Sequence, residues 1–174
     1  MIACKKRFYA LLVAPFILYG TPSQAHLIVA QSGTLNFVDG GAFLVLSMPP
    51  SAFSGIDENG DGEIAPTEVV NQLDAIKKQV HKGIELSDGT TGGVPLKGLL
   101  VSAVHLEENA KNPVAQLMIL GRFAISDPTP PVSLNIRLYG EVPEEAYYSV
   151  AVKHAGRTQK FLFSKETAKF DVVF

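Results

Sequence analysis

A mainly β fold, an antiparallel β-sandwich, is predicted by three features of the sequence. Apolar and polar residues alternate in many short segments, most clearly over Val132–Leu138, as expected of strands with one buried face. Clusters of Gly, Pro and Asp separate these segments, including Asp88–Gly93 and Asp127–Pro131. One acidic loop and one helical pattern interrupt the strands between residues 57 and 82.

Residues 1–25 have the pattern of a signal peptide. Basic residues 5–7 precede an apolar run over residues 8–19, and the small residue Ala25 follows at a suitable cleavage point. The run is too short to span a bilayer as a helix, which needs about 20 residues. We therefore expect cleavage after Ala25, a periplasmic or secreted location, and one domain formed by residues 26–174.

The composition excludes several classes of function. The single cysteine, Cys4, lies within the expected signal peptide, so the mature chain has neither a disulfide nor a thiol nucleophile. Removing basic residues 5–7 from the 15 Lys and Arg leaves 12, against 17 Asp and Glu, so the mature chain is acidic. Nucleic acid is not an expected partner, because no excess of basic side chains is present to neutralise phosphates.

The acidic loop, residues 57–68, reads Asp-Glu-Asn-Gly-Asp-Gly-Glu-Ile-Ala-Pro-Thr-Glu. Ca²⁺ takes about six to eight oxygen ligands, and a twelve-residue loop supplies them mainly from positions 1, 3, 5, 7 and 12, with Gly at position 6 for the sharp turn. The candidate ligands are the side chains of Asp57, Asn59, Asp61 and Glu68 and the backbone carbonyl of Glu63. Ala65 at position 9 has no side-chain oxygen, so a water would complete the site.

These residues match the EF-hand loop pattern at every defined position, and the segment resembles the EF-hand calcium-binding family. The resemblance implies Ca²⁺ as the cofactor, and it covers only the loop and the helix after it. Before the loop, Pro49 leaves room for at most one helical turn from about Pro50. EF-hands in calcium sensors usually come in pairs, and no second loop is found, so a structural ion is expected here rather than a switch.

The residues after the loop predict one amphipathic helix over residues 66–82. Its apolar stripe is formed by Val69, Leu73, Ile76 and Val80. Pro66 suits a first helical position, and Gly83 suits the end of the helix.

The remaining segments predict strands, which together are typical of an immunoglobulin-like sandwich. The expected strands are Leu27–Ala30, Thr34–Val38, Ala42–Leu46, Ile84–Ser87, Leu96–Leu106, Val114–Ile125, Val132–Leu138, Tyr147–Lys153, Thr158–Phe163 and Ala168–Phe174. In this arrangement the calcium loop and the helix are an insertion into, or a cover on, the sandwich.

Two other functions are compatible with the sequence. His26 would become the mature N-terminus, where its α-amine and imidazole together suit Cu²⁺, as in a periplasmic copper-binding carrier. The alternating segment that ends at Phe174 resembles the closing strand of a small outer-membrane β-barrel. No nucleophile elbow or zinc-binding helix motif is found, so an enzyme is not expected and no catalytic residue is predicted.

The order of the Ala25-His26-Leu27 start, the early strands and the EF-hand-like loop resembles the periplasmic portion of bacterial hydrogenase/urease-accessory-type membrane proteins. That resemblance implies a soluble counterpart of such a portion, because no stretch after residue 25 is long and apolar enough to span as a helix. Besides the calcium ion, the expected partner is therefore another envelope or membrane protein.

Overall fold

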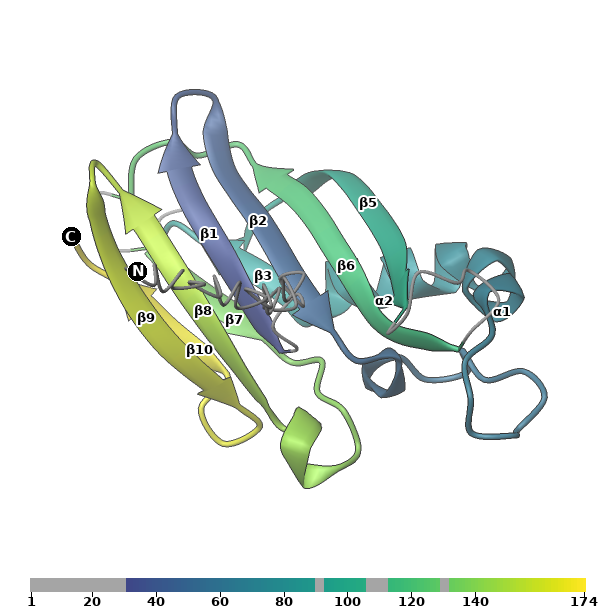
Figure 1. The fold of residues 1–174 in the computed structure, drawn as a ribbon. Helices are drawn as coiled ribbons and strands as arrows, with labels where there is room; N and C mark the ends of the chain where they lie inside the picture. Colours follow the sequence, from purple (N-terminus) through teal and green to yellow (C-terminus); the bar gives the residue numbers. More distant parts are fainter. Residues whose placement is uncertain (1–30, 90–92, 106–112, 129–131) are drawn as a thin grey trace, which may run out of the picture.

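Two β-sheets make up most of the protein. The structure is a computed structural model of the chain and describes residues 31–89, 93–105, 113–128 and 132–174. One sheet has six strands in the order β5-β6-β2-β1-β8-β9, and the other has four in the order β10-β7-β3-β4. Figure 1 shows the six-stranded sheet in front of the four-stranded one, and the helices at one end. The predicted mainly β fold is confirmed in this form.

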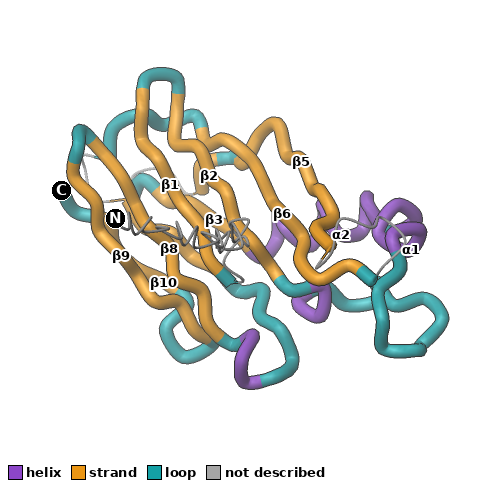
Figure 2. The backbone as a smooth tube through the Cα atoms, viewed as in Figure 1, coloured by secondary structure: helices purple, strands orange, loops and turns teal. Residues whose placement is uncertain are grey.

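Most of the chain forms strands, shown orange in Figure 2, and the two α-helices lie between β2 and β3 in the sequence. The strands are β1 Ser32–Val38, β2 Gly41–Met48, β3 Ile84–Ser87, β4 Gly93–Val94, β5 Leu96–His105, β6 Val114–Phe123, β7 Val132–Ile136, β8 Tyr147–His154, β9 Arg157–Ser164 and β10 Lys169–Val172. The helical elements are η1 Pro50–Ala52, α1 Pro66–Asn71, α2 Leu73–Gly83 and η2 Pro143–Glu145.

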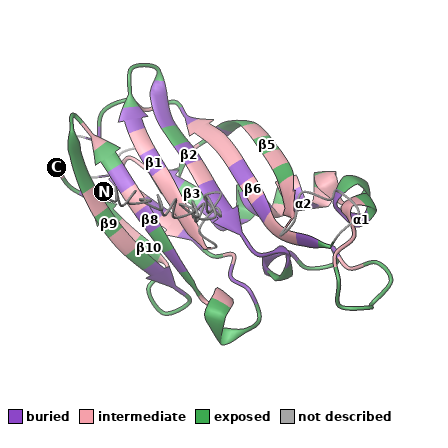
Figure 3. Cartoon of the chain, viewed as in Figure 1, coloured by how far each residue is buried: buried purple, intermediate pink, exposed green. Residues whose placement is uncertain are grey.

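The core lies between the two sheets because alternate residues of both sheets are buried. Leu44 and Leu46 of β2 are buried in the six-stranded sheet, and Leu134 and Ile136 of β7 are buried in the four-stranded sheet. Figure 3 shows this alternation as purple bands along the front strands. Side chains from two inner faces that interdigitate in this way form the core of a β-sandwich.

The predicted wholly antiparallel pairing is wrong at one place. Strands β1 and β8 are parallel neighbours, with Ser32 opposite Ser149 and Phe37 opposite His154. Parallel neighbours need a long crossover rather than a hairpin. Here the whole chain between β1 and β8 makes that connection. The alternation of apolar and polar residues is a local pattern, so it could not predict that these two distant strands pair in parallel.

Most predicted strands are confirmed, with small shifts at their ends. The predicted strand Val132–Leu138 ends at Ile136. The Arg137 N–H still donates to the Gly83 carbonyl, at 2.8 Å, but Gly83 is the last residue of α2 and not part of β3. The two-residue strand β4 was not predicted. The expected strand Leu27–Ala30, the expected signal peptide and His26 all lie outside the described residues.

The single predicted helix over residues 66–82 is divided into α1 and α2. The break is at Gln72, whose φ of −94° and ψ of 8° lie outside the helical range. The Gln72 side chain at this break donates from Nε2 to Glu58 Oε1, at 2.6 Å. The predicted apolar stripe is largely confirmed, since Val69, Ile76 and Val80 are buried.

The segment before the acidic loop forms one 3-10 turn, η1, as the sequence predicts. Phe53 and Ile56 follow it and are buried in the same apolar cluster as the strands. The buried side chains of Phe53 and Ile56 therefore anchor the chain to the sandwich just before the loop, and α1 packs against it just after the loop through Val69.

Candidate metal centre

Two glycines give the acidic loop its curvature. Gly60 and Gly62 have φ values of 74° and 83°, in the left-handed region that residues with a Cβ atom rarely adopt. Neither glycine has another group within 4 Å of the place where a Cβ would lie. Both positions therefore require glycine for backbone conformation rather than for space.

The side chains at the first, third and fifth loop positions turn inward onto the backbone. The Asp57 carboxylate accepts hydrogen bonds from the Gly60 N–H to Oδ1, at 2.7 Å, and from the Gly62 N–H to Oδ2, at 2.9 Å. Asn59 Oδ1 accepts from the Asp61 N–H, and Asp61 Oδ1 accepts from the Glu63 N–H, both at 2.8 Å. These bonds wind the segment into a compact turn with its side-chain oxygens on the inner side.

The carboxylate of Glu68 closes the loop from the helix side. It is only 5% exposed, although it lies in the first turn of α1. Its Oε1 accepts from the N–H groups of Glu58 and Asn59, at 2.9 and 3.3 Å. Its Oε2 accepts from the Ala65 N–H, at 2.8 Å. One side chain thus joins the start of the loop, its end and the helix N-terminus, where a negative charge is also favoured by the helix dipole.

The donor set fits Ca²⁺ in its chemistry. Asp57, Asp61 and Glu68 supply carboxylate oxygens, and Asn59 supplies an amide oxygen. Glu68 lies in the first turn of α1, and the other three lie in the turn before it. A carboxylate oxygen that accepts one N–H bond retains a second lone pair for a cation. Within the described ranges, no three His, Cys, Asp or Glu side chains lie close enough together to hold a metal ion as they stand. One candidate ligand oxygen, Asp61 Oδ2, instead accepts a hydrogen bond from Asn59 Nδ2. Binding Ca²⁺ would therefore require these side chains to draw closer together.

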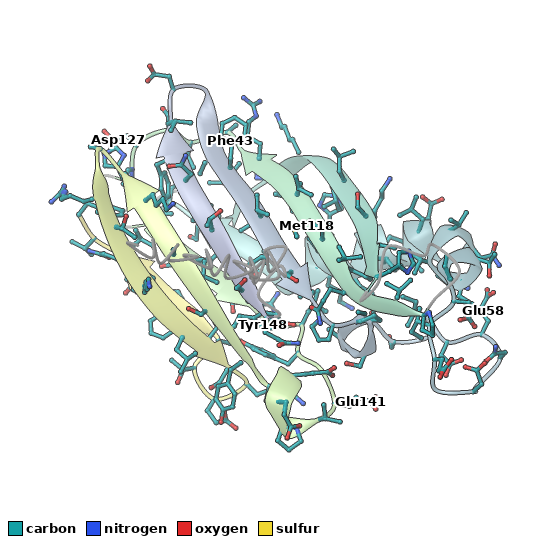
Figure 4. The ribbon with its side chains drawn as sticks, in the orientation of Figure 1. Phe43, Glu58, Met118, Asp127, Glu141 and Tyr148 are labelled. Atoms are coloured by element: carbon teal, nitrogen blue, oxygen red, sulfur yellow. The ribbon has the colours of Figure 1, made fainter. Side chains whose placement is uncertain are left out.

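Glu58 has a role that the sequence analysis missed. It points from the loop toward the break between the helices, where its two oxygens accept from Asn71 Nδ2, at 3.0 Å, and Gln72 Nε2, at 2.6 Å. The position of Glu58 on the loop is labelled in Figure 4. These two bonds lower the pKa of Glu58 despite a small opposing effect of desolvation. The sequence gives no signal for this contact, because a helix break at Gln72 has to be known first.

We expect Glu58→Gln to reduce stability at neutral pH and the difference from the native protein to shrink in acid. The folded pKa of Glu58 is lowered from 4.5, so its stabilisation is present above that value and is lost as the pH falls through the folded pKa. Urea unfolding at a series of pH values measures the difference, with the exposed residue in Glu144→Gln as the matched control. Parallel curves for native and Glu58→Gln protein would contradict this role.

Two further contacts attach the loop to the sandwich. The carbonyl of Ile64, at loop position 8, accepts from the Val114 N–H at the start of β6, at 2.8 Å. On the other side, Gln79 of α2 exchanges hydrogen bonds with the backbone of Ser54, both at 3.0 Å. Strand β6 thus provides a backbone partner for the loop, and α2 holds the chain just before it.

The other histidines that a copper site would need come from three different elements. His81 lies on α2, His105 on β5 and His154 on β8. His154 packs against Phe37 and Phe174, with ring centroids 6.2 and 5.6 Å apart. The structure therefore gives His154 an aromatic surrounding, and His26 lies outside the described residues.

The chain matches no protein-family model and no curated protein sequence. Among the described residues, no helix has the length and apolar character needed to cross a membrane.

Proposed function

We propose that this chain is an exported calcium-binding protein, in which one Ca²⁺ ion stabilises a β-sandwich that binds another envelope or membrane protein. The proposal treats residues 57–68 as an EF-hand-like insert in an immunoglobulin-like sandwich. The observation that carries it is the Glu68 carboxylate, buried at loop position 12 and hydrogen-bonded to both ends of the loop. An ordinary Asp- and Gly-rich turn has no need of a buried carboxylate six residues after its last glycine.

In this proposal each ligand has a stated task. The side chains of Asp57, Asn59 and Asp61 and the Glu63 carbonyl would hold one side of the ion. Both Glu68 oxygens would hold the other, which requires Oε1 to give up one of the two N–H bonds that it accepts from Glu58 and Asn59. The bound ion supplies positive charge that offsets the mutual repulsion of three carboxylates. Because the loop is anchored at Ile64 and Ser54, ordering it also orders the start of α1 and the junction with β6.

We expect Ca²⁺ to raise the melting temperature. An ion that binds only the folded protein adds RT ln(1 + [Ca²⁺]/Kd), which is about 1.4 kcal/mol at a tenfold excess over Kd. Three ligand carboxylates and an extracellular setting suggest a Kd on the order of 10⁻⁴–10⁻³ M. Thermal unfolding of the purified protein with EGTA and with millimolar CaCl₂ measures this shift.

The controls for this experiment are Asp57→Ala and Glu68→Gln, each of which removes a charged ligand. Both are expected to abolish the calcium-dependent shift, and Glu144→Gln, which removes a charge outside the loop, is expected to retain it. MgCl₂ at the same concentration separates a specific site from ionic screening. An equal melting temperature with EGTA and with CaCl₂ in the native protein would refute the proposal.

A further inference from the structure

A cleft of about 750 Å³ lies beside the calcium loop. Four segments line it: Pro50–Asp57 in part, Gly62–Ile64, Pro113–Ala115 at the start of β6, and the connection from β7 to β8 at Glu141 and Glu145. Small-ligand sites in proteins have volumes of roughly 300–1,000 Å³. The cleft therefore has room for a few amino-acid side chains but not for a folded domain.

The cleft combines an apolar lining with acidic groups. Its accessible apolar lining comes from the half-buried Ile64 and Ala115 and the exposed Pro113, while Phe53, Ile56 and Val114 border it from the buried core. The charged residues among its lining are Asp57, Glu63, Glu141 and Glu145, and no Lys, Arg or His is among them. Figure 4 shows Glu141 on the connection between β7 and β8, on the same side of the sandwich as Glu58. An occupant that complements this lining carries positive charge next to apolar groups.

The walls of the cleft are tied to each other before any occupant binds. The Ser51 hydroxyl donates to Glu145 Oε2 and links η1 to η2 across the cleft. The Val114 N–H donates to the Ile64 carbonyl and links β6 to the loop. Preformed walls lower the ordering cost of binding.

A buried hydroxyl that is not part of the cleft lining lies near Glu145. The Tyr148 hydroxyl is fully buried and has no hydrogen-bond partner within the part of the chain that the structure describes. Burial, and then the charges of Tyr139 and Glu145, raise the pKa of Tyr148. The hydroxyl consequently stays neutral and remains a donor close to Glu145.

We propose that this cleft binds a short peptide segment of a partner protein, with Lys or Arg placed beside apolar residues. The positive side chain would lie between the carboxylates of Glu63, Glu141 and Glu145, and the apolar neighbour would cover Ile64 and Pro113. A small inorganic cation or a polyamine would leave the apolar lining uncovered, which favours a peptide. Peptide binding at this cleft does not depend on bound calcium, because Glu63 would contribute only its backbone carbonyl to the calcium site and its carboxylate remains available to the peptide.

The test is isothermal titration of the purified protein with the peptide acetyl-Leu-Arg-Leu-Arg-amide, and with acetyl-Leu-Glu-Leu-Glu-amide as the control peptide. We expect one basic peptide to bind per chain and the acidic peptide not to bind. The double variant Glu63→Gln/Glu141→Gln removes two carboxylates of the cleft but no side-chain calcium ligand. Two exposed ion pairs lost together correspond to about fivefold weaker binding.

The matched control is Asp74→Asn/Glu144→Gln, which removes the same charge from residues outside the cleft and is expected to bind as the native protein does. Ala115→Leu fills the cleft without changing charge and is also expected to weaken binding, with thermal unfolding as the check that it folds. Equal weakening by the two double variants, or equal binding of both peptides, would overturn the proposal. Each titration is run with EGTA and with CaCl₂. If the peptide binds but calcium does not shift the melting temperature, the calcium site is refuted and the peptide site is not.

Discussion

Glu68→Ala is expected to destabilise the protein by about 2–4 kcal/mol even without calcium, because it removes the acceptor of three backbone N–H groups. The carboxylate is 5% exposed, so water reaches the orphaned donors poorly. The loss combines unpaired donors at Glu58, Asn59 and Ala65 with the loss of a negative charge at the N-terminus of α1. Urea unfolding in EGTA measures this free energy without any metal contribution.

The control for Glu68→Ala is Glu63→Ala in the same loop. The Glu63 side chain is exposed, and its backbone N–H bond to Asp61 is unaffected by the substitution, so a change below about 0.5 kcal/mol is expected. Glu68→Gln retains one carbonyl acceptor and the side-chain length, and it should fall between the two. If Glu68→Ala were as stable as Glu63→Ala, the buried carboxylate would not hold the loop together.

The sequence allows the inner part of this site to be predicted, because its signals are local. Gly60 and Gly62 are needed where the backbone turns, and the side chains of Asp57, Asn59 and Asp61 each accept from a backbone N–H only a few residues away. The side-chain period of a strand likewise shows which face of β7 is buried. Whether these oxygens bind Ca²⁺ stays a prediction.

The outer part of the site depends on pairings between distant segments. The contacts of Ser54 with Gln79 and of Ile64 with Val114 join residues whose sequence neighbourhoods give no hint of each other. The parallel pairing of β1 with β8 has the same origin, since it depends on the path of the intervening chain. The cleft could not be predicted for this reason, because its walls come from four segments that only the tertiary fold brings together.

Phe53→Ala is expected to have the largest effect, a loss of about 3–5 kcal/mol in the free energy of unfolding. Phe53 is 2% exposed and belongs to the apolar core cluster, so the substitution removes buried surface and leaves a cavity. It lies four residues before Asp57, in the segment that Gln79 holds through Ser54. We therefore expect the loss to reach the loop as well. Under conditions in which the native protein is folded and binds calcium, the variant should bind calcium more weakly.

Phe43→Ala is the matched control for Phe53→Ala, since it makes the same chemical change at a ring that is 42% exposed on β2. Its ring is not part of the buried cluster, so a loss well below that of Phe53→Ala is expected. Chemical denaturation in EGTA gives the free energies, and repeating it with CaCl₂ gives the calcium contribution of each variant. Similar losses for the two variants would show that Phe53 does not anchor the loop. A large loss with an unchanged calcium contribution would show that the core and the loop are stabilised independently.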